Sequence, residues 1–229
     1  MMDGAWTSER LHEALRRHFG YETFRDGQAE AILNLLAGQD VMLVMPTGSG
    51  KSLCYQLTAL LMPGVTVVVS PLIALMKDQV DALERRGIAA TFLNSSVDGA
   101  EMAYRLDGVR AGRYKLVYVA PERFRNRRFS EALAQAQVSL FTIDEAHCIS
   151  LWGHDFRPDY RRIRTLVAEL GDGIPVLATT ATANDRVVAD VAAQLGVGAG
   201  SDDTLVLRGG LDRPSLHLSV VRIEEPAQR

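Results

Sequence analysis

Short apolar runs alternate with amphipathic stretches along most of this chain. The apolar runs are rich in β-branched residues and nearly continuous in hydrophobicity, as expected for strands covered on both faces. They occupy residues 41–45, 66–70, 90–93, 116–120, 140–143, 176–180 and 204–207. Between them, a helical spacing of apolar residues occupies 28–37, 52–61, 73–86, 99–111 and 185–195. This alternation predicts an α/β fold with a doubly wound, mostly parallel sheet, whose functional residues gather at the carboxyl ends of strands.

The pattern changes near residue 209, and two regions are expected. Residues 1–208 form the α/β domain, in which Asp98, with Glu101 three positions later, indicates the start of one helix. Residues 209–229 begin with the linker-like GGLDRPS and continue with LHLSVVRI, which has the composition of one more strand. Because that strand has no later partner, it is interpreted as the first strand of a missing second domain.

Composition places limits on the class of protein. The chain has 229 residues, 47% of them hydrophobic, which is enough to bury a sizeable core in one domain. No run of about 18 apolar residues predicts a membrane span, and the sequence MMDGAWTSER is unlike a secretion signal. The two cysteines, Cys54 and Cys148, lie in no CxxC pair, which disfavours structural zinc and fits a reducing cytoplasm.

Charge is unevenly distributed, although the net charge is only −3. Residues 105–128 contain eight basic and two acidic side chains, a local balance of +6. A second basic group contains Arg157, Arg161, Arg162 and Arg164. Such runs most often form a solvated face, but in a net-acidic protein they also favour a polyanionic partner, whose identity stays open.

The clearest chemical motif is VMLVMPTGSGKS at residues 41–52. A strand, a glycine-rich turn and a helix start in this order let backbone N–H groups converge on phosphate oxygens. We expect Lys51 to reach the β- and γ-phosphates of a nucleotide and Ser52 to bind magnesium, with the loop formed by Thr47, Gly48, Ser49 and Gly50. The general motif has glycine where this chain has Met45. The alternative is an ordinary strand-to-helix turn that contains a lysine.

Two adjacent acids, Asp144 and Glu145, end another apolar run. Alone, such a pair is more often a cap or a solvated turn. Next to a phosphate loop, the aspartate is expected to hold magnesium and the glutamate to orient and deprotonate the attacking water. No kinase-type catalytic loop is present, so hydrolysis is favoured over phosphotransfer.

Taken together, the motifs resemble those of a known family. FGYETFRDGQ, MPTGSGKSLCYQL, VSPLIALMKDQV, YVAPERF, DEAHCISLWGHDFRPDY and ATTATA follow one another in the order found in RecQ-type DNA helicases of superfamily two. The likeness covers residues 11–220 and corresponds to the first of that family's two RecA-like motor domains. It implies ATP and magnesium as cofactors, DNA as the partner, and an arginine finger on the second motor domain, without which hydrolysis is expected to be slow.

The resemblance also implies residue roles. Tyr21 and Arg25 would flank the adenine base and Gln28 would bind its edge; otherwise these residues form a surface helix entry. Coupling of hydrolysis to unwinding would involve His147, Thr180 and Thr182, although Thr180 also fits a buried strand end. The residues implied along the single-stranded DNA track are Pro71, Leu72, Lys77, Asn94, Ser95 and Arg123.

The segment after DEAH corresponds to that family's aromatic-rich loop, which senses single-stranded DNA. Trp152 and Phe156 would stack against bases, while His154 and Arg157 would supply hydrogen bonds and charge. The alternative is that both aromatic residues fill a small core beneath a surface loop. The family commonly has glutamine where this chain has Leu151, so a polar contact at that position is not expected.

Two other functions stay open at this point. The first is a DEAH-type RNA helicase or translocase, which the LWGHDFRP segment and the form of the adenine motif disfavour. The second is a nucleotide-binding switch or DNA-binding scaffold without hydrolysis, which intact Lys51, Asp144 and Glu145 disfavour. The sequence gives neither the oligomeric state nor the preferred DNA structure.

Overall fold

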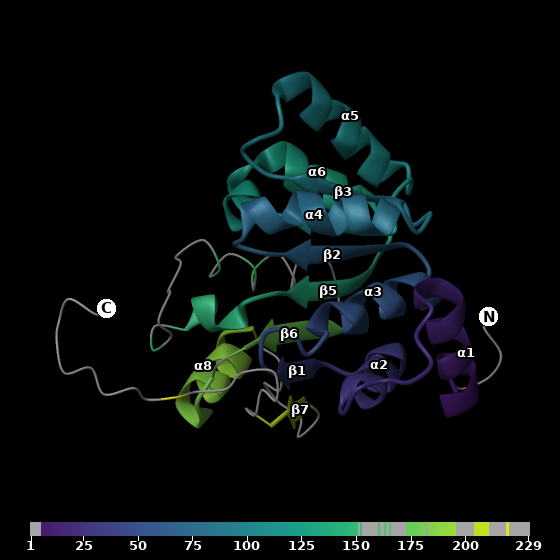
Figure 1. Cartoon of the computed structure of the whole chain (residues 1–229). Coiled ribbons are helices and arrows are strands. Elements are labelled where there is room, and N and C mark those ends of the chain that lie inside the picture. Colours follow the sequence, from purple (N-terminus) through teal and green to yellow (C-terminus); the bar gives the residue numbers. More distant parts are fainter. Residues whose placement is uncertain are drawn as a thin grey trace, which may run out of the picture.

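The described part of the chain contains a single parallel sheet of seven strands (Figure 1). The computed structural model describes residues 6–150, 152, 160, 163, 165, 173–181, 183–195, 204–210 and 219. The strand order is β3-β4-β2-β5-β6-β1-β7, and every pairing is parallel. The strands are β1 Val41–Val44, β2 Val65–Val69, β3 Ala90–Leu93, β4 Leu116–Val119, β5 Val138–Ile143, β6 Val176–Thr180 and β7 Leu205–Arg208. The predicted fold class is confirmed.

The predicted strands all exist, and most differ from the prediction by one residue at an end. The largest difference is in β5, which starts at Val138 rather than at residue 140. Its first two residues are only partly buried, so their hydrophobicity gives a weak signal. The N–H of Val65 bonds the carbonyl of Gln137 at 2.8 Å, and an irregularity between Val65 and Thr66 accommodates the extra length.

Helices surround the sheet, and two of them were not among the predicted stretches. The predicted ones are α2 Gln28–Leu36, α3 Lys51–Leu61, α4 Ile73–Glu84, α5 Gly99–Arg110 and α8 Asp185–Leu195. The additional ones are α1 Ser8–Phe19 and α6 Arg127–Gln135, together with the short 3-10 helices η1 Pro121–Arg125 and η2 Ala146–Ile149. As expected, Asp98 caps α5 by accepting the N–H of Glu101 at 2.9 Å. The side chain of Glu101 pairs with Arg105 instead of completing a capping box.

Two hydrophobic layers, one on each face of the sheet, form the core. Helices α1, α2, α3 and α4 cover one face, and α5, α6 and α8 cover the other. Successive side chains of a strand point to opposite faces of the sheet. In β1, Val41 and Leu43 therefore belong to the first layer, and Met42 and Val44 belong to the second. This double covering explains why the strands read as continuous apolar runs. It also leaves the carboxyl ends of the strands as the edge where polar loops can form a site.

Among the described residues, no helix is long and apolar enough to cross a membrane. The strand expected in LHLSVVRI, and with it the boundary of a second domain at residue 209, lies almost entirely outside the described residues.

Candidate active site and nucleic-acid track

The glycine-rich turn connects β1 to the first residue of α3. Gly50, immediately before Lys51, has φ 86°, a left-handed conformation that residues with a Cβ rarely adopt. A Cβ atom at this position would lie 2.6 Å from Nε2 of Gln28. Glycine therefore serves two purposes here: it permits the turn, and it lets the side chain of α2 approach the loop. The strand–turn–helix context predicted for residues 41–52 is present.

The amino group of Lys51 points back into the loop. Its Nζ donates to the carbonyl of Met45 at 2.8 Å and to that of Pro46 at 3.2 Å. Burial lowers the pKa of Lys51, while the nearby carboxylates of Glu145 and Asp144 act in the opposite direction. The lysine and both acids are thus close enough to interact electrostatically. Met45, which stands in place of the usual glycine, is buried, with its sulfur methyl close to Gly27.

Gln28 connects the predicted adenine segment to the phosphate loop through hydrogen bonds. Its Oε1 accepts the N–H of Arg25 at 2.9 Å, and its Nε2 donates to the carbonyls of Ser49 at 3.2 Å and Gly50 at 3.1 Å. Nη1 of Arg25 bonds the carbonyl of Gly48 at 2.5 Å. Gln28 is only 2% exposed, so its visible role is structural, and a bond to the base edge stays a prediction. The side chain of Tyr21 is exposed, with 51% of its surface open to solvent.

Asp144 follows β5 and is held from two sides. Its backbone N–H bonds the carbonyl of Val69 at 2.8 Å, and its Oδ1 accepts the Thr179 hydroxyl at 2.7 Å. Burial raises the pKa of the Asp144 carboxyl, and the Thr179 hydrogen bond partly offsets this by favouring the ionised form. Thr179, one position before the predicted coupling residue, was not identified from the sequence, because alternation predicts only that a strand residue is covered.

Glu145 has φ 52° and ψ 46°, and among the described residues it is the one non-glycine with positive φ. This conformation is uncommon outside glycine and occurs at functional sites. Oε2 of Glu145 lies 3.3 Å from Nδ1 of His147, which lies 3.0 Å from the hydroxyl of Thr180. A chain of contacts therefore runs from the second acid to the end of β6. Thr182, the other predicted coupling residue, lies outside the described residues.

A single cavity of about 680 Å³ unites these groups. Its lining includes Tyr21, Arg25, Gln28, Thr47, Gly48, Gly50, Lys51, Ser52, Asp144 and Glu145. The predicted phosphate loop, acid pair and adenine segment are therefore brought together. Ser49 is the loop residue that does not line the cavity, although its carbonyl holds Gln28.

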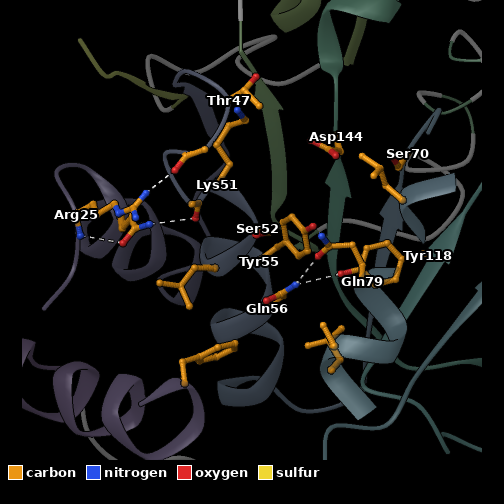
Figure 2. A pocket seen from close by; sticks show the side chains of 18 of the residues that line it. Arg25, Thr47, Lys51, Ser52, Tyr55, Gln56, Ser70, Gln79, Tyr118 and Asp144 are labelled. Carbon is orange, nitrogen blue, oxygen red and sulfur yellow. Dashed lines mark hydrogen bonds between the residues drawn. The ribbon is translucent and has the colours of Figure 1, made fainter. Parts of the chain in front are cut away.

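The cavity continues between α3 and α4 into a polar cluster that sequence reasoning missed (Figure 2). Gln56 donates from Nε2 to Oε1 of Gln79 at 3.0 Å and to the hydroxyl of Tyr118 at 3.3 Å. Burial raises the pKa of Tyr118 to about 12 and that of Tyr55 well above its ordinary value. The glutamine among the mainly apolar residues 53–59 of α3 is the signal that could have indicated this cluster.

A magnesium ion would find a suitable set of donors beside Asp144. Magnesium typically binds through one or two carboxylates together with phosphate oxygens and water, rather than through a full set of protein ligands. Asp144 and Ser52 line the same cavity, and only Oδ1 of Asp144 accepts the Thr179 bond. Among the described residues, no group of three or more His, Cys, Asp or Glu side chains could hold a metal.

The residues predicted to contact single-stranded DNA lie in the segments that follow β2, β3 and β4, which are neighbours in the sheet. These residues are Pro71, Leu72, Lys77, Asn94, Ser95 and Arg123. Leu72, Lys77 and Ser95 are exposed and available to a ligand. Asn94 is 1% exposed, and its Oδ1 accepts both the N–H and the hydroxyl of Ser96. Arg123 donates to the carbonyl of Asn94. The last two residues therefore organise the loop that presents Ser95, and their contact with DNA stays a prediction.

The basic segment 105–128 is less available than its charge suggests. Arg105 and Arg110 form ion pairs with Glu101 and Asp107, and Arg127 pairs with Glu131. Arg113 and Lys115 donate to backbone carbonyls. Much of the +6 balance is therefore used to hold α5, α6 and their loops, so charge counting alone does not identify a nucleic-acid surface.

Trp152 is 57% exposed, which contradicts the alternative that it fills a small core beneath the loop. The guanidinium of Arg186 in α8 lies over its ring. His154, Phe156 and Arg157, together with the rest of the second basic group, lie outside the described residues.

A cavity that joins a phosphate loop to an acid pair on a parallel sheet is the arrangement of a P-loop nucleotide hydrolase. A family model for DEAD/DEAH box helicases matches residues 25–191, and the chain belongs to this family. The matched region contains the phosphate loop, the acid pair and the coupling strand.

Within that family, the chain is similar to RecQ DNA helicases, as its motifs indicated. It is 48% identical over 216 residues to ATP-dependent DNA helicase RecQ of Bacillus subtilis, covering 94% of this chain and 36% of the relative. It is 42% identical over 215 residues to the RecQ helicase of Haemophilus influenzae, covering 94% and 34%. The resemblance is confirmed, and the chain spans about a third of the length of these relatives.

Solved helicase structures share the fold at lower identity. The DNA-bound helicase MrfA has a TM-score of 0.65 and 20% identity, covering 88% of this chain and 27% of that one. The helicase domain of Hef from Pyrococcus furiosus has a TM-score of 0.58 and 18% identity, covering 79% and 36%. These likenesses support the architecture of the sheet and its helices.

Proposed function

We propose that this chain is the ATP-binding and hydrolysing lobe of a RecQ-like 3′-to-5′ DNA helicase. The observation that carries the proposal is the shared cavity, in which the phosphate loop faces Asp144 and Glu145. A nucleoside triphosphate bound by Lys51 would place its terminal phosphate near Glu145. The similarity to DNA helicases favours DNA over RNA as the substrate.

The chemistry follows from the positions of the residues. Backbone N–H groups of the loop and the amine of Lys51 bind phosphate oxygens, which requires the lysine to exchange its loop carbonyls for the ligand. Asp144 and Ser52 would hold magnesium, which when bound neutralises charge that develops on the transferred phosphoryl group. Glu145 orients a water molecule and accepts its proton, and the fixed left-handed backbone aims this carboxylate.

Coupling to DNA uses the contact chain from Glu145 through His147 to Thr180. DNA would run along the carboxyl edge of β2, β3 and β4, contact Leu72, Lys77 and Ser95, and stack on Trp152. Completion of the ATP site requires a second RecA-like domain beyond residue 208, so the isolated chain is expected to hydrolyse ATP slowly. Action on DNA implies the compartment that contains it, the cytoplasm and its nucleoid if the source is bacterial.

The proposal is tested by ATP hydrolysis with and without single-stranded DNA, for this chain and for a version extended beyond residue 229. Glu145→Gln should retain ATP but lose turnover by about 10²- to 10⁴-fold, the usual contribution of a general base. Glu131→Gln, an exposed carboxylate on α6, is the matched control and should change neither property. An extended protein whose ATPase ignores DNA would refute the motor function.

A further inference from the structure

The turn that follows η2 is anchored to α8 by a buried hydroxyl group. Ser150 is fully buried, and its Oγ donates to Oδ2 of Asp190 at 2.5 Å. The same oxygen accepts the backbone N–H of Trp152 at 3.1 Å. The other carboxylate oxygen of Asp190 accepts from Gln194 at 3.3 Å. The start of the segment after the acid pair is therefore fixed to one face of α8.

A second contact lies one helical turn earlier on the same face. Arg186 precedes Asp190 by four positions, a spacing that places both side chains next to each other on a helix. The guanidinium carbon of Arg186 lies 3.3 Å from the centre of the Trp152 ring. The ring nevertheless keeps 57% exposure, so the face away from Arg186 is open to solvent. An indole held by a cation on one face and open on the other is a platform for a flat ligand.

We infer that Arg186 is a positioning residue, which holds the Trp152 ring so that its open face can receive a nucleobase. This inference rests on the proposed function and adds to it a residue on a different element. Stacking on a preordered ring avoids the loss of side-chain freedom that a mobile ring would suffer on binding. Arginine suits the role because its planar guanidinium stacks on aromatic faces, which a lysine ammonium does less well.

The position of α8 gives this contact a route to the ATP site. The helix follows β6, whose last residue Thr180 contacts His147 in η2. Ser150 and Trp152 come directly after η2. A base that stacks on Trp152 is therefore connected to His147 through η2 and to Thr180 through α8, which follows β6.

The test uses the chain with Trp6→Phe, which leaves Trp152 as its single tryptophan. Arg186→Lys keeps the charge but loses the planar stack, and Arg186→Ala loses both. Both variants should expose Trp152 more to acrylamide quenching without DNA. Both should weaken oligo(dT) binding about 2- to 5-fold, the range that corresponds to 0.5–1 kcal/mol for an exposed cation–π contact. Arg10→Lys, which changes an exposed arginine on α1 in the same way, is the matched control and should change neither reading.

A phosphate contact by Arg186 would give a different pattern and overturn the inference. In that case Arg186→Lys would bind DNA like the parent, and Arg186→Ala would bind with a shallower salt dependence. Unchanged quenching in both variants would also overturn it. In a Trp152→Ala background, Arg186→Lys should cost no further affinity, because the platform is already gone.

The same series separates failure of the inference from failure of the proposed function. If Trp152→Ala weakens DNA binding and Arg186→Lys does not, only the role of Arg186 is refuted. If Trp152→Ala has no effect, or the parent does not bind oligo(dT), the DNA-binding role of Trp152 fails and the inference fails with it. Circular dichroism of each variant should match the parent, because Arg186 is exposed on α8.

Discussion

Replacing Gln28 with glutamate should weaken nucleotide binding through the phosphate loop. The substitution keeps the shape of the side chain and the acceptor for the N–H of Arg25. It replaces the Nε2 donor with an oxygen that faces the carbonyls of Ser49 and Gly50, 3.2 and 3.1 Å from that nitrogen. Two hydrogen bonds thereby become two contacts between acceptors. The loop must then move away, and a nucleotide must restore its arrangement in order to bind.

The size of the effect follows from burial, because Gln28 is 2% exposed and water cannot easily replace the lost donors. An unsatisfied buried polar group costs about 1–3 kcal/mol. If the nucleotide has to recover this free energy, affinity falls by about 5- to 150-fold. Protonation of the new carboxyl restores one donor, so the loss should shrink as the pH is lowered.

The assay is equilibrium binding of fluorescent ATP and GTP analogues, with inorganic triphosphate as a competitor. Because the strain lies in the phosphate loop, all three ligands should lose affinity to a similar extent. Asn34→Asp on the same helix is the matched control, since Asn34 bonds the carbonyl of Glu30 within α2. A loss confined to ATP would refute the loop mechanism and assign Gln28 to the adenine edge.

Three further predictions concern stability and reactivity. Gly64→Ala should be severely destabilising in urea unfolding, because Gly64 has φ 78° and the new Cβ would lie 2.1 Å from the carbonyl oxygen of Gln137. Gly38 has φ 85° but open space around it, so Gly38→Ala should cost only the conformational penalty of about 1–2 kcal/mol. Cys54 and Cys148 should both resist a thiol reagent until urea is added, since both are buried and burial raises the pKa of Cys54 to about 12; rapid native labelling would contradict this. Tyr55 and Tyr118 should remain protonated above the ordinary tyrosine pKa of about 10. Because the unfolded chain loses these protons first, the free energy of unfolding should fall as pH rises above that value, and native tyrosinate absorbance from both residues near pH 10 would refute their burial.

The site was predictable where a motif is local and less so where partners come from distant segments. Lys51 and Asp144 were identified because each follows an apolar run at a strand end, and parallel strands bring those ends to one edge. The contacts of Gln56 with Tyr118, 62 positions away, have no counterpart in local spacing. In the basic segment, the ion pairs of α5 and α6 follow the local i,i+3 and i,i+4 spacing of the sequence, whereas the backbone carbonyls of Tyr104 and Met62 that accept from Arg113 and Lys115 do not.

The sequence by itself determined the fold class, the strands, the phosphate loop and the acid pair, because hydrophobic period and glycine placement act over a few neighbouring residues. Only the tertiary structure decided how these parts work together. It placed Gln28 against the loop, gave Glu145 its left-handed backbone, and set Arg186 over Trp152. The reason is physical: each of these features depends on how separate elements pack together, and packing is a property of the whole chain.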